Sequence, residues 1–376
     1  MATCGNAFLR IRYRLAGQVL RYVDRGTVNC GQARHVSSEM ERGAGGRSSF
    51  SGVVATVFGS TGFVGRYVVN RLGRVGSQIV VPLRGDEHDY RHLRPMGDLG
   101  QITPLEYHLK DVESVKKAVR HSNVVVNLVG RDYETWNFKY REVHEEGARV
   151  IAEACREAGV QRLIHFSALN ADPHSPSSFL QSKARGEELV KEAFPTATIV
   201  RPADIYGHED RFLSFYASLR GFPFHLIPVL DRGNLTHKLP VYVGDVAQGV
   251  VNIISDQTTA SKTFEFVGPH SFVLRDLVRY IYHVMYRQCV LVSPPRWAYR
   301  LVARTLELSP FVPHMTRDIL TRLHLSNKAT PGVPRLEDVG VSPLALEDKA
   351  LPILRRYRDF LHFDRSLDEL EAPNKS

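Results

Sequence analysis

Residues 53–65 read Val53-Val54-Ala55-Thr56-Val57-Phe58-Gly59-Ser60-Thr61-Gly62-Phe63-Val64-Gly65, an apolar run that leads directly into the pattern G-x-x-G-x-x-G. The run predicts a strand, and the amphipathic residues after it predict a helix. Between a strand and a helix, Gly59 makes the turn, Gly62 lets the backbone approach a pyrophosphate, and Gly65 lets helix and strand pack closely. Unpaired N–H groups at the helix start attract phosphate. We therefore predict a dinucleotide site, rather than tight packing alone, at Gly59, Ser60, Thr61, Gly62, Phe63, Val64 and Gly65.

The same alternation of short β-branched runs and amphipathic segments continues to Pro202. This rhythm is typical of an α/β protein with a doubly wound parallel sheet, the Rossmann fold. The run Val124-Val125-Val126 has the continuous apolarity of a strand that is covered on both faces. We expect six strands at Val53–Phe58, Gln78–Pro82, Leu105–His108, Val124–Leu128, Arg162–Ser167 and Thr198–Arg201, and helices at Gly62–Arg74, Val112–Arg120, Tyr140–Ala158 and Ser178–Phe194.

After Pro202, residues rich in Pro, Gly and aromatic side chains predict the start of a substrate lobe. Val241–Ile254 and Thr263–Phe266 are expected to return to the sheet, and Leu274–Tyr286 is expected to be a helix. The tail after Pro331 carries no clear signal. The predicted organisation is a presequence at 1–35, a linker at 36–52, a nucleotide-binding Rossmann domain at 53–270 with substrate-lobe insertions after 202, and a smaller C-terminal lobe at 271–376.

Length and charge limit the classes of function. The chain has 376 residues, a hydrophobic content of 43% and a formal net charge of +9, which allow one large core plus a smaller lobe. In residues 1–35 six arginines face one acid, and without this stretch the charge falls to +4. That charge is too small to indicate an extended nucleic-acid surface. No apolar run approaches the roughly 20 residues of a membrane-spanning helix.

Residues 1–35 are rich in arginine, poor in acids and apolar along one helical side, as mitochondrial presequences are. We expect their removal on import to the matrix, and the open alternative is a basic arm that stays attached. Cys155 and Cys289 form no C-x-x-C pattern, so no disulfide framework is predicted. His88 and His92 have the spacing of a metal pair but no third ligand, so we predict a solvated segment and no metal site.

The ends of the later strands carry the side chains expected to contact a dinucleotide. Arg84 follows the second strand, where an NAD site would have an acid, so a 2'-phosphate and hence NADP(H) is favoured. The alternative is an NAD site in which Asp86 provides the acid. Asp111 follows the third strand and can accept from the adenine amino group, cap the next helix, or do both. Leu128, Val129 and Gly130 end the fourth strand beside the ribose, and Ser167 ends the fifth on the nicotinamide side.

Together these residues resemble the atypical, extended branch of the short-chain dehydrogenase/reductase superfamily over about Val53 to Phe266. The resemblance rests on 59–65, Asp111, 127–130, Ser167, Lys183, Arg201-Pro202 and Val243-Gly244-Asp245-Val246-Ala247. It implies pyrophosphate binding at Gly59, Gly62 and Gly65, contact of Arg84 with the 2'-phosphate and of Asp111 with adenine, and contact of Lys183 with the nicotinamide ribose. Pro202 is also expected to bind the cofactor.

Position 179 departs from the superfamily pattern, which has Tyr-x-x-x-Lys where this chain has Phe179-Leu180-Gln181-Ser182-Lys183. A lysine one turn after a phenol lowers the pKa of that phenol for proton transfer, and Phe179 has no hydroxyl. We therefore predict no catalytic site. The alternative is an active NADPH-dependent reductase that uses Lys183 itself, or a phenol from Tyr133 or Tyr206.

The presequence, Arg84, Phe179 and the basic C-terminal segments are similar to the reductase-like accessory subunits of mitochondrial NADH:ubiquinone oxidoreductase, complex I. That resemblance implies a non-catalytic subunit on the matrix side of the inner membrane, near the quinone region, that holds NADPH and contacts other complex I subunits. The segments Trp297–Leu306 and Thr316–Leu325 combine apolar side chains with arginines. This composition suits a membrane surface or a partner's groove, and it suits equally a helix packed on its own domain. A main function in RNA or lipid binding through these segments is the third alternative.

Overall fold

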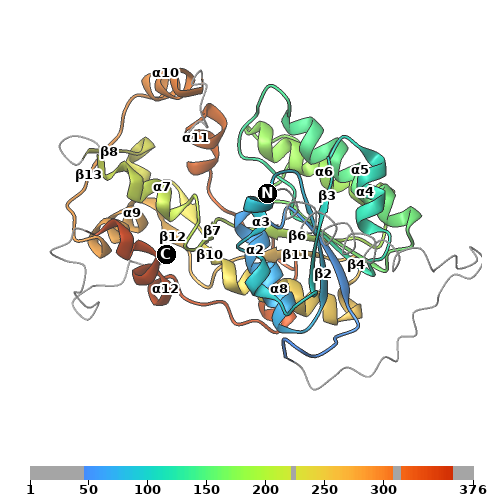
Figure 1. Ribbon diagram of the computed structural model, residues 1–376. Coiled ribbons are helices and arrows are strands. Elements are labelled where there is room, and N and C mark those ends of the chain that lie inside the picture. Colours follow the sequence, from blue (N-terminus) through green and yellow to red (C-terminus); the bar gives the residue numbers. More distant parts are fainter. Residues whose placement is uncertain (1–45, 222–225, 308–314, 359–376) are drawn as a thin grey trace, which may run out of the picture. The chain divides into compact units, whose positions relative to one another are not determined.

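The computed structural model describes residues 46–221, 226–307 and 315–358, apart from the side chain of Glu87. The predicted presequence and the first part of the predicted linker, residues 36–45, lie outside them. A seven-stranded sheet organises the fold (Figure 1). Its order is β11 (Thr263–Phe266), β6 (Thr198–Pro202), β5 (Arg162–Phe166), β4 (Val124–Asn127), β1 (Val54–Phe58), β2 (Gln78–Leu83) and β3 (Ile102–Glu106). All its neighbouring strands pair in parallel, which confirms the predicted Rossmann sheet.

Helices cover both faces of this sheet (Figure 1). One face is covered by α2 (Phe63–Arg74) and α8 (Val243–Ser255), and the other by α4 (Val112–Val119), α5 (Gly147–Glu157) and α6 (Ser178–Ala193). The strands between them are buried on both sides, as in the pattern BBBB of β4 and BBBBB of β5. This double burial is why the strands have continuous rather than alternating apolarity.

The region after residue 240 tests the predicted return of two segments to the sheet. Thr263–Phe266 does return, as the edge strand β11 beside β6. Val241–Ile254 does not: only β10 (Val241–Tyr242) is extended, and α8 begins at Val243. Its buried apolar residues recur at helical spacing, which the short β-branched runs concealed. The third strand is also earlier than predicted, at Ile102–Glu106.

The predicted helix Tyr140–Ala158 begins with a π-helical stretch at Arg141–Glu146 before α5 continues in regular α geometry. Gly186 of α6 packs against this stretch so closely that an added Cβ would overlap the carbonyl of His144. Such wide turns are frequent at functional sites. Here the turn holds His144 in a buried position, only 1% exposed, beside α6.

A second core lies outside the sheet and takes residues from 206–229 as well as from 272–354. The predicted bounds at 53–270 and 271–376 stay predictions. The helices of this part are α7 (Leu213–Ser218), α9 (Leu274–Val284), α10 (Arg296–Glu307), α11 (Arg317–Leu323) and α12 (Leu346–Leu354). Its strand pairs are β7 (Ile205–Tyr206) with β10, β8 (Leu226–Pro228) with β13 (Val290–Val292), and β9 (His237–Lys238) with β12 (Phe272–Val273). The short helices among the described residues are α3 (Glu87–Tyr90), η1 (Arg94–Met96), η3 (Leu219–Gly221), η5 (Leu230–Gly233), η6 (Gln257–Thr259), η7 (Glu337–Val339) and η8 (Arg355–Tyr357).

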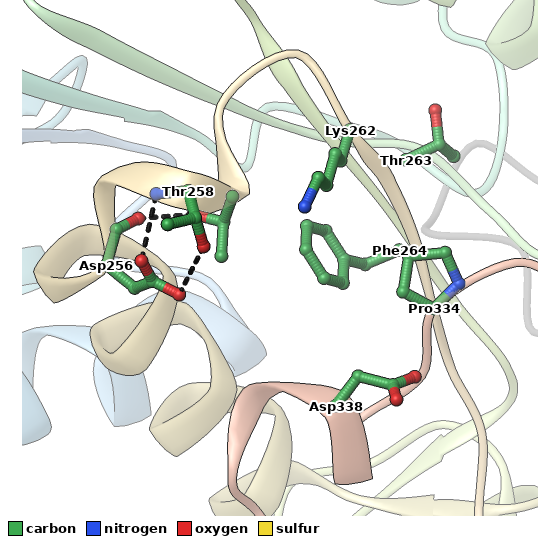
Figure 2. A pocket seen from close by; sticks show the side chains of 8 residues that line it. Asp256, Thr258, Lys262, Thr263, Phe264, Pro334 and Asp338 are labelled. Carbon is green, nitrogen blue, oxygen red and sulfur yellow. Dashed lines mark hydrogen bonds between the residues drawn. The ribbon is translucent and has the colours of Figure 1, made fainter.

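The segment after Pro331 returns to the outer edge of the sheet. The Glu265 N–H donates to the Pro334 carbonyl at 2.9 Å, and the Thr330 N–H donates to the Glu265 carboxylate at 2.8 Å. Leu336, 1% exposed, joins the core beneath. A hollow of about 380 Å³ stays open outside β11, with Lys262 and Asp338 on its rim (Figure 2).

The tight turn at 59–65 makes a prediction about stability. A Cβ added at Gly65 would lie 2.6 Å from the Cα of Ser60. We expect Gly65→Ala to lower the free energy of unfolding by about 1–3 kcal/mol, because the turn and α2 must move apart. Gly221→Ala is the matched control, since a Cβ there meets nothing within 4 Å. Thermal melts of both variants check this, and equal melting temperatures would contradict it.

Candidate functional site: a cleft at the carboxyl ends of the strands

A cleft of about 1360 Å³ opens at the carboxyl ends of the central strands. In doubly wound sheets this is the edge where ligands bind. The cleft is lined by most of the residues that the sequence predicts to contact the dinucleotide, namely Gly59, Gly62, Phe63, Val64, Gly65, Leu128, Gly130, Ser167, Lys183 and Pro202. Ser60, Thr61, Arg84, Asp111 and Val129 are not among its lining residues.

The floor of the cleft is the turn between β1 and α2. Gly59 has φ +77°, a left-handed conformation, and an added Cβ would lie 3.0 Å from the Leu128 carbonyl carbon and oxygen. Gly62 is the N-cap of α2 and provides no capping side chain. The first N–H groups of a helix have no partner within the helix, so this end is suited to an anion. The Ser60 hydroxyl is buried with no hydrogen-bond partner in the described part of the chain.

Three cations meet around Phe138 near the ends of β2, β3 and β4. Arg84 lies with its guanidinium carbon 5.4 Å from the ring centroid, Lys110 with its Nζ at 5.0 Å, and Arg131 at 5.9 Å. Arg84 is exposed, and Arg131 lines the cleft. Asp111 caps α4, because its carboxylate accepts from the Glu113 N–H at 3.2 Å. The capping role is thus observed, and contact with adenine stays a prediction.

Lys183 reaches into the cleft from α6, and a Cβ added at Gly130 would lie 3.3 Å from its Nζ. Its side chain is nearly fully buried and donates from Nζ to the Phe166 carbonyl at 3.0 Å. Burial lowers the pKa of its ammonium to about 8, against the raising effect of Asp132 and Glu187. The neighbouring Ser167 hydroxyl is buried in the cleft wall without a hydrogen-bond partner among the described residues. Two groups able to contact a ribose or a nicotinamide amide therefore face one space.

The ring of Phe179, one turn before Lys183, is held from several sides. The Arg322 guanidinium lies 4.0 Å from its centroid, and the His144 ring meets it edge-on at 5.1 Å. Burial, with the nearby Lys183 charge, lowers the pKa of His144 to about 2. The neutral ring accepts at Nε2 from the Arg131 N–H and donates at Nδ1 to the Ser182 hydroxyl. Phe179 is therefore packed between a fixed imidazole and a cation.

Asp132 joins this end of the cleft to residues far along the chain. Its carboxylate pairs with Arg211 at 2.9 Å and with Arg322 at 3.3 Å, and Arg322 also donates to the Asp132 carbonyl at 3.1 Å. Burial acts to raise the pKa of this carboxyl, but the charges of Arg322 and Arg211 outweigh it and the pKa is lowered. The Asp318 carboxylate of α11 accepts from the Ser177 hydroxyl at 2.9 Å, so α11 is also tied to the start of α6.

Some of these residues were not found by sequence reasoning. Arg131 and Asp132 directly follow the predicted turn at 127–130, so extending that motif past Gly130 was enough to find them. His144 and Arg322 carry no such signal. Arg322, for example, lies 190 residues along the chain from Asp132. Of the two alternative phenols, Tyr133 lines the cleft, whereas Tyr206 donates to the Ala345 carbonyl at 3.4 Å and is not a lining residue.

The hollow outside β11 is a weaker candidate for a ligand site (Figure 2). Asp256 accepts from the N–H and the hydroxyl of Thr258, both at 2.8 Å, and Asp338 accepts from the Arg335 N–H at 2.6 Å. The carboxylates of Asp256 and Asp338 are thus already hydrogen-bonded within the protein.

Within the described residues no cluster of His, Cys, Asp or Glu is placed to hold a metal ion. Those residues also include no helix long and apolar enough to cross a membrane.

Comparisons with known proteins agree with this geometry. A family model described as NAD(P)H-binding matches residues 59–214. NADH dehydrogenase (ubiquinone) 1 alpha subcomplex subunit 9, mitochondrial, of Mus musculus is 49% identical over 327 residues, which cover 87% of this chain and 86% of the mouse protein. The chain belongs to the alpha subcomplex subunit 9 family. It therefore has an NAD(P)-binding domain of the short-chain reductase type.

Two further proteins that are similar to this chain are informative. A protein named ceramide reductase from Caulobacter vibrioides is 31% identical over 250 residues, covering 65% of this chain and 74% of that protein. The crystal structure of an NADPH-dependent quinone oxidoreductase from Escherichia coli, complexed with NADPH, matches with a TM-score of 0.62 at 17% identity. It covers 79% of this chain and 98% of the bacterial one. The structural match shows the shared fold, and with the family model it supports a nicotinamide cofactor.

The buried ammonium of Lys183 predicts a pH dependence of stability. Its pKa is about 8 in the folded chain against 10.5 for the free side chain, so between these values the unfolded chain binds more protons. Stability should rise with pH in that window, by up to about 3 kcal/mol, relative to Lys183→Met. Lys117→Met, at an exposed position of α4, is the control. Urea denaturation of the nucleotide-free protein at pH 7 to 10 measures the difference, and parallel curves for wild type and Lys183→Met would contradict it.

Proposed function

We propose that the chain is a non-catalytic subunit of mitochondrial complex I that binds NADPH as a structural ligand and so supports assembly of the complex. The observation that carries this proposal is the packing of Phe179. At the position one turn before Lys183, where a reductase needs a phenol, an aromatic ring without a hydroxyl lies 4.0 Å from the Arg322 guanidinium. A ring in this position contributes packing and a cation–π contact but no proton.

The choice of NADPH over NADH rests on charge. Arg84, Lys110 and Arg131 surround Phe138, and a 2'-phosphate beside them would meet guanidinium groups rather than an acid. Lys110 is partly neutralised by Glu142 at 2.9 Å, whereas Arg84 forms no ion pair with any described residue. The turn with Gly59, Gly62 and Gly65 would hold the pyrophosphate. The nucleotide would provide hydrogen-bond partners for the buried hydroxyls of Ser60 and Ser167.

A bound nucleotide would stabilise the fold by mass action. A ligand that binds only the folded state contributes about 4 kcal/mol at a thousandfold excess over its Kd. In this cleft the nucleotide would contact both the β1–α2 turn and the residues around Asp132, which is tied to α11 through Arg322. Nucleotide binding would then order a surface formed by the C-terminal helices, on which partner subunits of complex I would assemble.

The subunit 9 relatives are named as mitochondrial subunits of NADH dehydrogenase (ubiquinone). We assign this chain the same complex, with other complex I subunits as partners, on the matrix side of the inner membrane and peripheral to it. Contact with membrane lipid is part of this proposal. Binding to nucleic acid is not part of it.

Emptying the nucleotide site should impair assembly. Gly62→Asp places a carboxylate at the N-terminus of α2 and should abolish binding, and Arg84→Glu should weaken NADPH binding by roughly 10- to 100-fold while affecting NADH less. Arg91→Glu, an exposed charge reversal on a nearby segment, is the control. Native mass spectrometry with acid release identifies the nucleotide, and native gels of mitochondria expressing each variant report assembled complex I. Normal assembly without bound nucleotide would refute the structural role.

An active NADPH-dependent reductase is the second candidate. Two observations favour it: the pKa of Lys183 is lowered to about 8 by burial, so a neutral amine is accessible, and a relative carries the name ceramide reductase. Tyr133 also lines the cleft.

Under the structural proposal, purified protein should show no sustained NADPH oxidation with acyl, quinone or sugar substrates. Many turnovers that disappear in Lys183→Met but persist in Lys117→Met would instead establish the reductase. The bound nucleotide should be quantified in each variant, so that loss of binding is not read as loss of chemistry.

A further inference from the structure

The cleft has an arm that a dinucleotide does not explain. Beyond Arg322 its walls are Phe215 and Leu219 from α7 and η3, Tyr299 and Val302 from α10, and Met315 and Ile319 beside and on α11. We call these six residues and the space between them the apolar arm. A pocket for one small ligand holds about 300–1,000 Å³, and the whole cleft measures about 1360 Å³. The volume therefore allows a second ligand beside the nucleotide.

The polar groups of the arm are already bonded to the protein. The Tyr299 hydroxyl donates to the Pro228 carbonyl at 3.1 Å, and the Ser218 hydroxyl donates to the Phe215 carbonyl at 2.7 Å. What these residues present to the space is hydrocarbon and aromatic surface. A polar substrate would lose its hydration there without gaining hydrogen bonds, whereas a long alkyl chain would gain about 0.8 kcal/mol for each CH₂ that leaves water.

The arm opens onto an exposed surface of α10. Val302 and Leu306 line the cleft and are also 52% and 42% exposed, and their neighbours Trp297 and Leu301 are 72% and 57% exposed. On the other flank of the same helix from Val302 and Leu306, Arg300 and Arg304 are exposed and form no ion pair with the described residues. An amphipathic helix with a tryptophan, aliphatic side chains and free arginines is typical of a helix that lies on an anionic membrane surface.

We propose that the apolar arm takes up one acyl chain of an anionic phospholipid, whose phosphate stays outside on the exposed surface of α10, the helix that carries Arg300 and Arg304. The chain enters past Val302 and Leu306 and ends near Arg322, where the walls become polar. This goes beyond adsorption of α10 on a membrane, because it places lipid between α7, α10 and α11. It does not require the nucleotide proposal, which places NADPH at the β1–α2 turn.

The full-length chain, loaded with NADPH, is incubated with vesicles of phosphatidylglycerol and phosphatidylcholine that contain a phosphatidylglycerol with a diazirine near the end of one acyl chain. After photolysis, peptide mass spectrometry maps the adducts. We expect adducts on Phe215 and Ile319, inside the arm. Replacing all phosphatidylglycerol, labelled lipid included, by phosphatidylcholine should lower them about tenfold, as expected when two arginines lose an anionic partner.

Two variants separate the arm from the surface. Ala298→Trp adds bulk at the mouth of the arm, since Ala298 lines the cleft, and should lower the inner adducts about tenfold without reducing vesicle binding. Leu301→Ala is the matched control on the outer surface and should leave the ratio of inner to outer adducts unchanged.

Adducts confined to Trp297 and Leu301, or inner adducts that persist in Ala298→Trp, would overturn the proposal. So would an absence of inner adducts, as expected if another part of the chain fills the arm. The wild-type map decides even if Ala298→Trp misfolds. NADPH is quantified in the same samples. If NADPH stays bound and inner adducts are absent, only the lipid proposal fails. If NADPH is lost, the proposal of a structural nucleotide fails.

Discussion

The close approach of backbone to backbone at the β1–α2 turn is the constraint on which the cleft depends. Gly59 lies in a left-handed conformation against the Leu128 carbonyl, and Gly65 lies against Gly59 and Ser60 with no space for a side chain. These contacts bring the uncapped start of α2 to the carboxyl ends of β1 and β4. A larger residue at either glycine would move the helix away and remove the phosphate-binding end from the cleft. Lys183 and Ser167 line the same cleft, so their contacts with a ligand would depend on where this turn holds it.

The part of the cleft around Phe179 is built for packing. Phe179 lines the cleft, and Tyr140, His144 and Arg322 pack against the other sides of its ring. Each contact stabilises the position of α6, and Arg322 in addition brings Asp132 and α11 together. A side chain with no polar atom tolerates this enclosure, whereas a buried phenol would require a hydrogen-bond partner of its own. Phe179 thus provides contacts between distant segments at the position where the superfamily pattern has a tyrosine.

The fold could be predicted from the sequence because its signals are local. Each strand is an apolar run, and each crossover helix repeats with helical period, so the sheet from β1 to β6 follows without knowledge of distant contacts. Prediction was wrong at Val241–Ile254, where small and β-branched residues hid the helical spacing of α8. The nucleotide turn was also local. The residues around Phe179 were not: Asp132, His144, Arg211 and Arg322 meet only after the chain returns from α11, and the arginines of that helix read equally well as solvated. Sequence reasoning finds what one motif contains and misses what separate segments build together.

The ion pairs of Asp132 join the segment after β4 to the segments that carry α7 and α11. Arg322 extends from α11, a helix that contributes Ile319 to the apolar arm, and Arg211 precedes α7, which contributes Phe215. Any ligand that fixes Asp132 and its neighbours therefore also restricts α7 and α11. Coupling between two sites is reciprocal in free energy. If the proposed nucleotide tightens the arm around an acyl chain, the acyl chain must tighten the nucleotide by the same factor. A subunit of this construction would hold its nucleotide most firmly where lipid is present. Loading at the membrane would then be a physical reason for keeping a reductase-type cleft that has Phe179 one turn before Lys183.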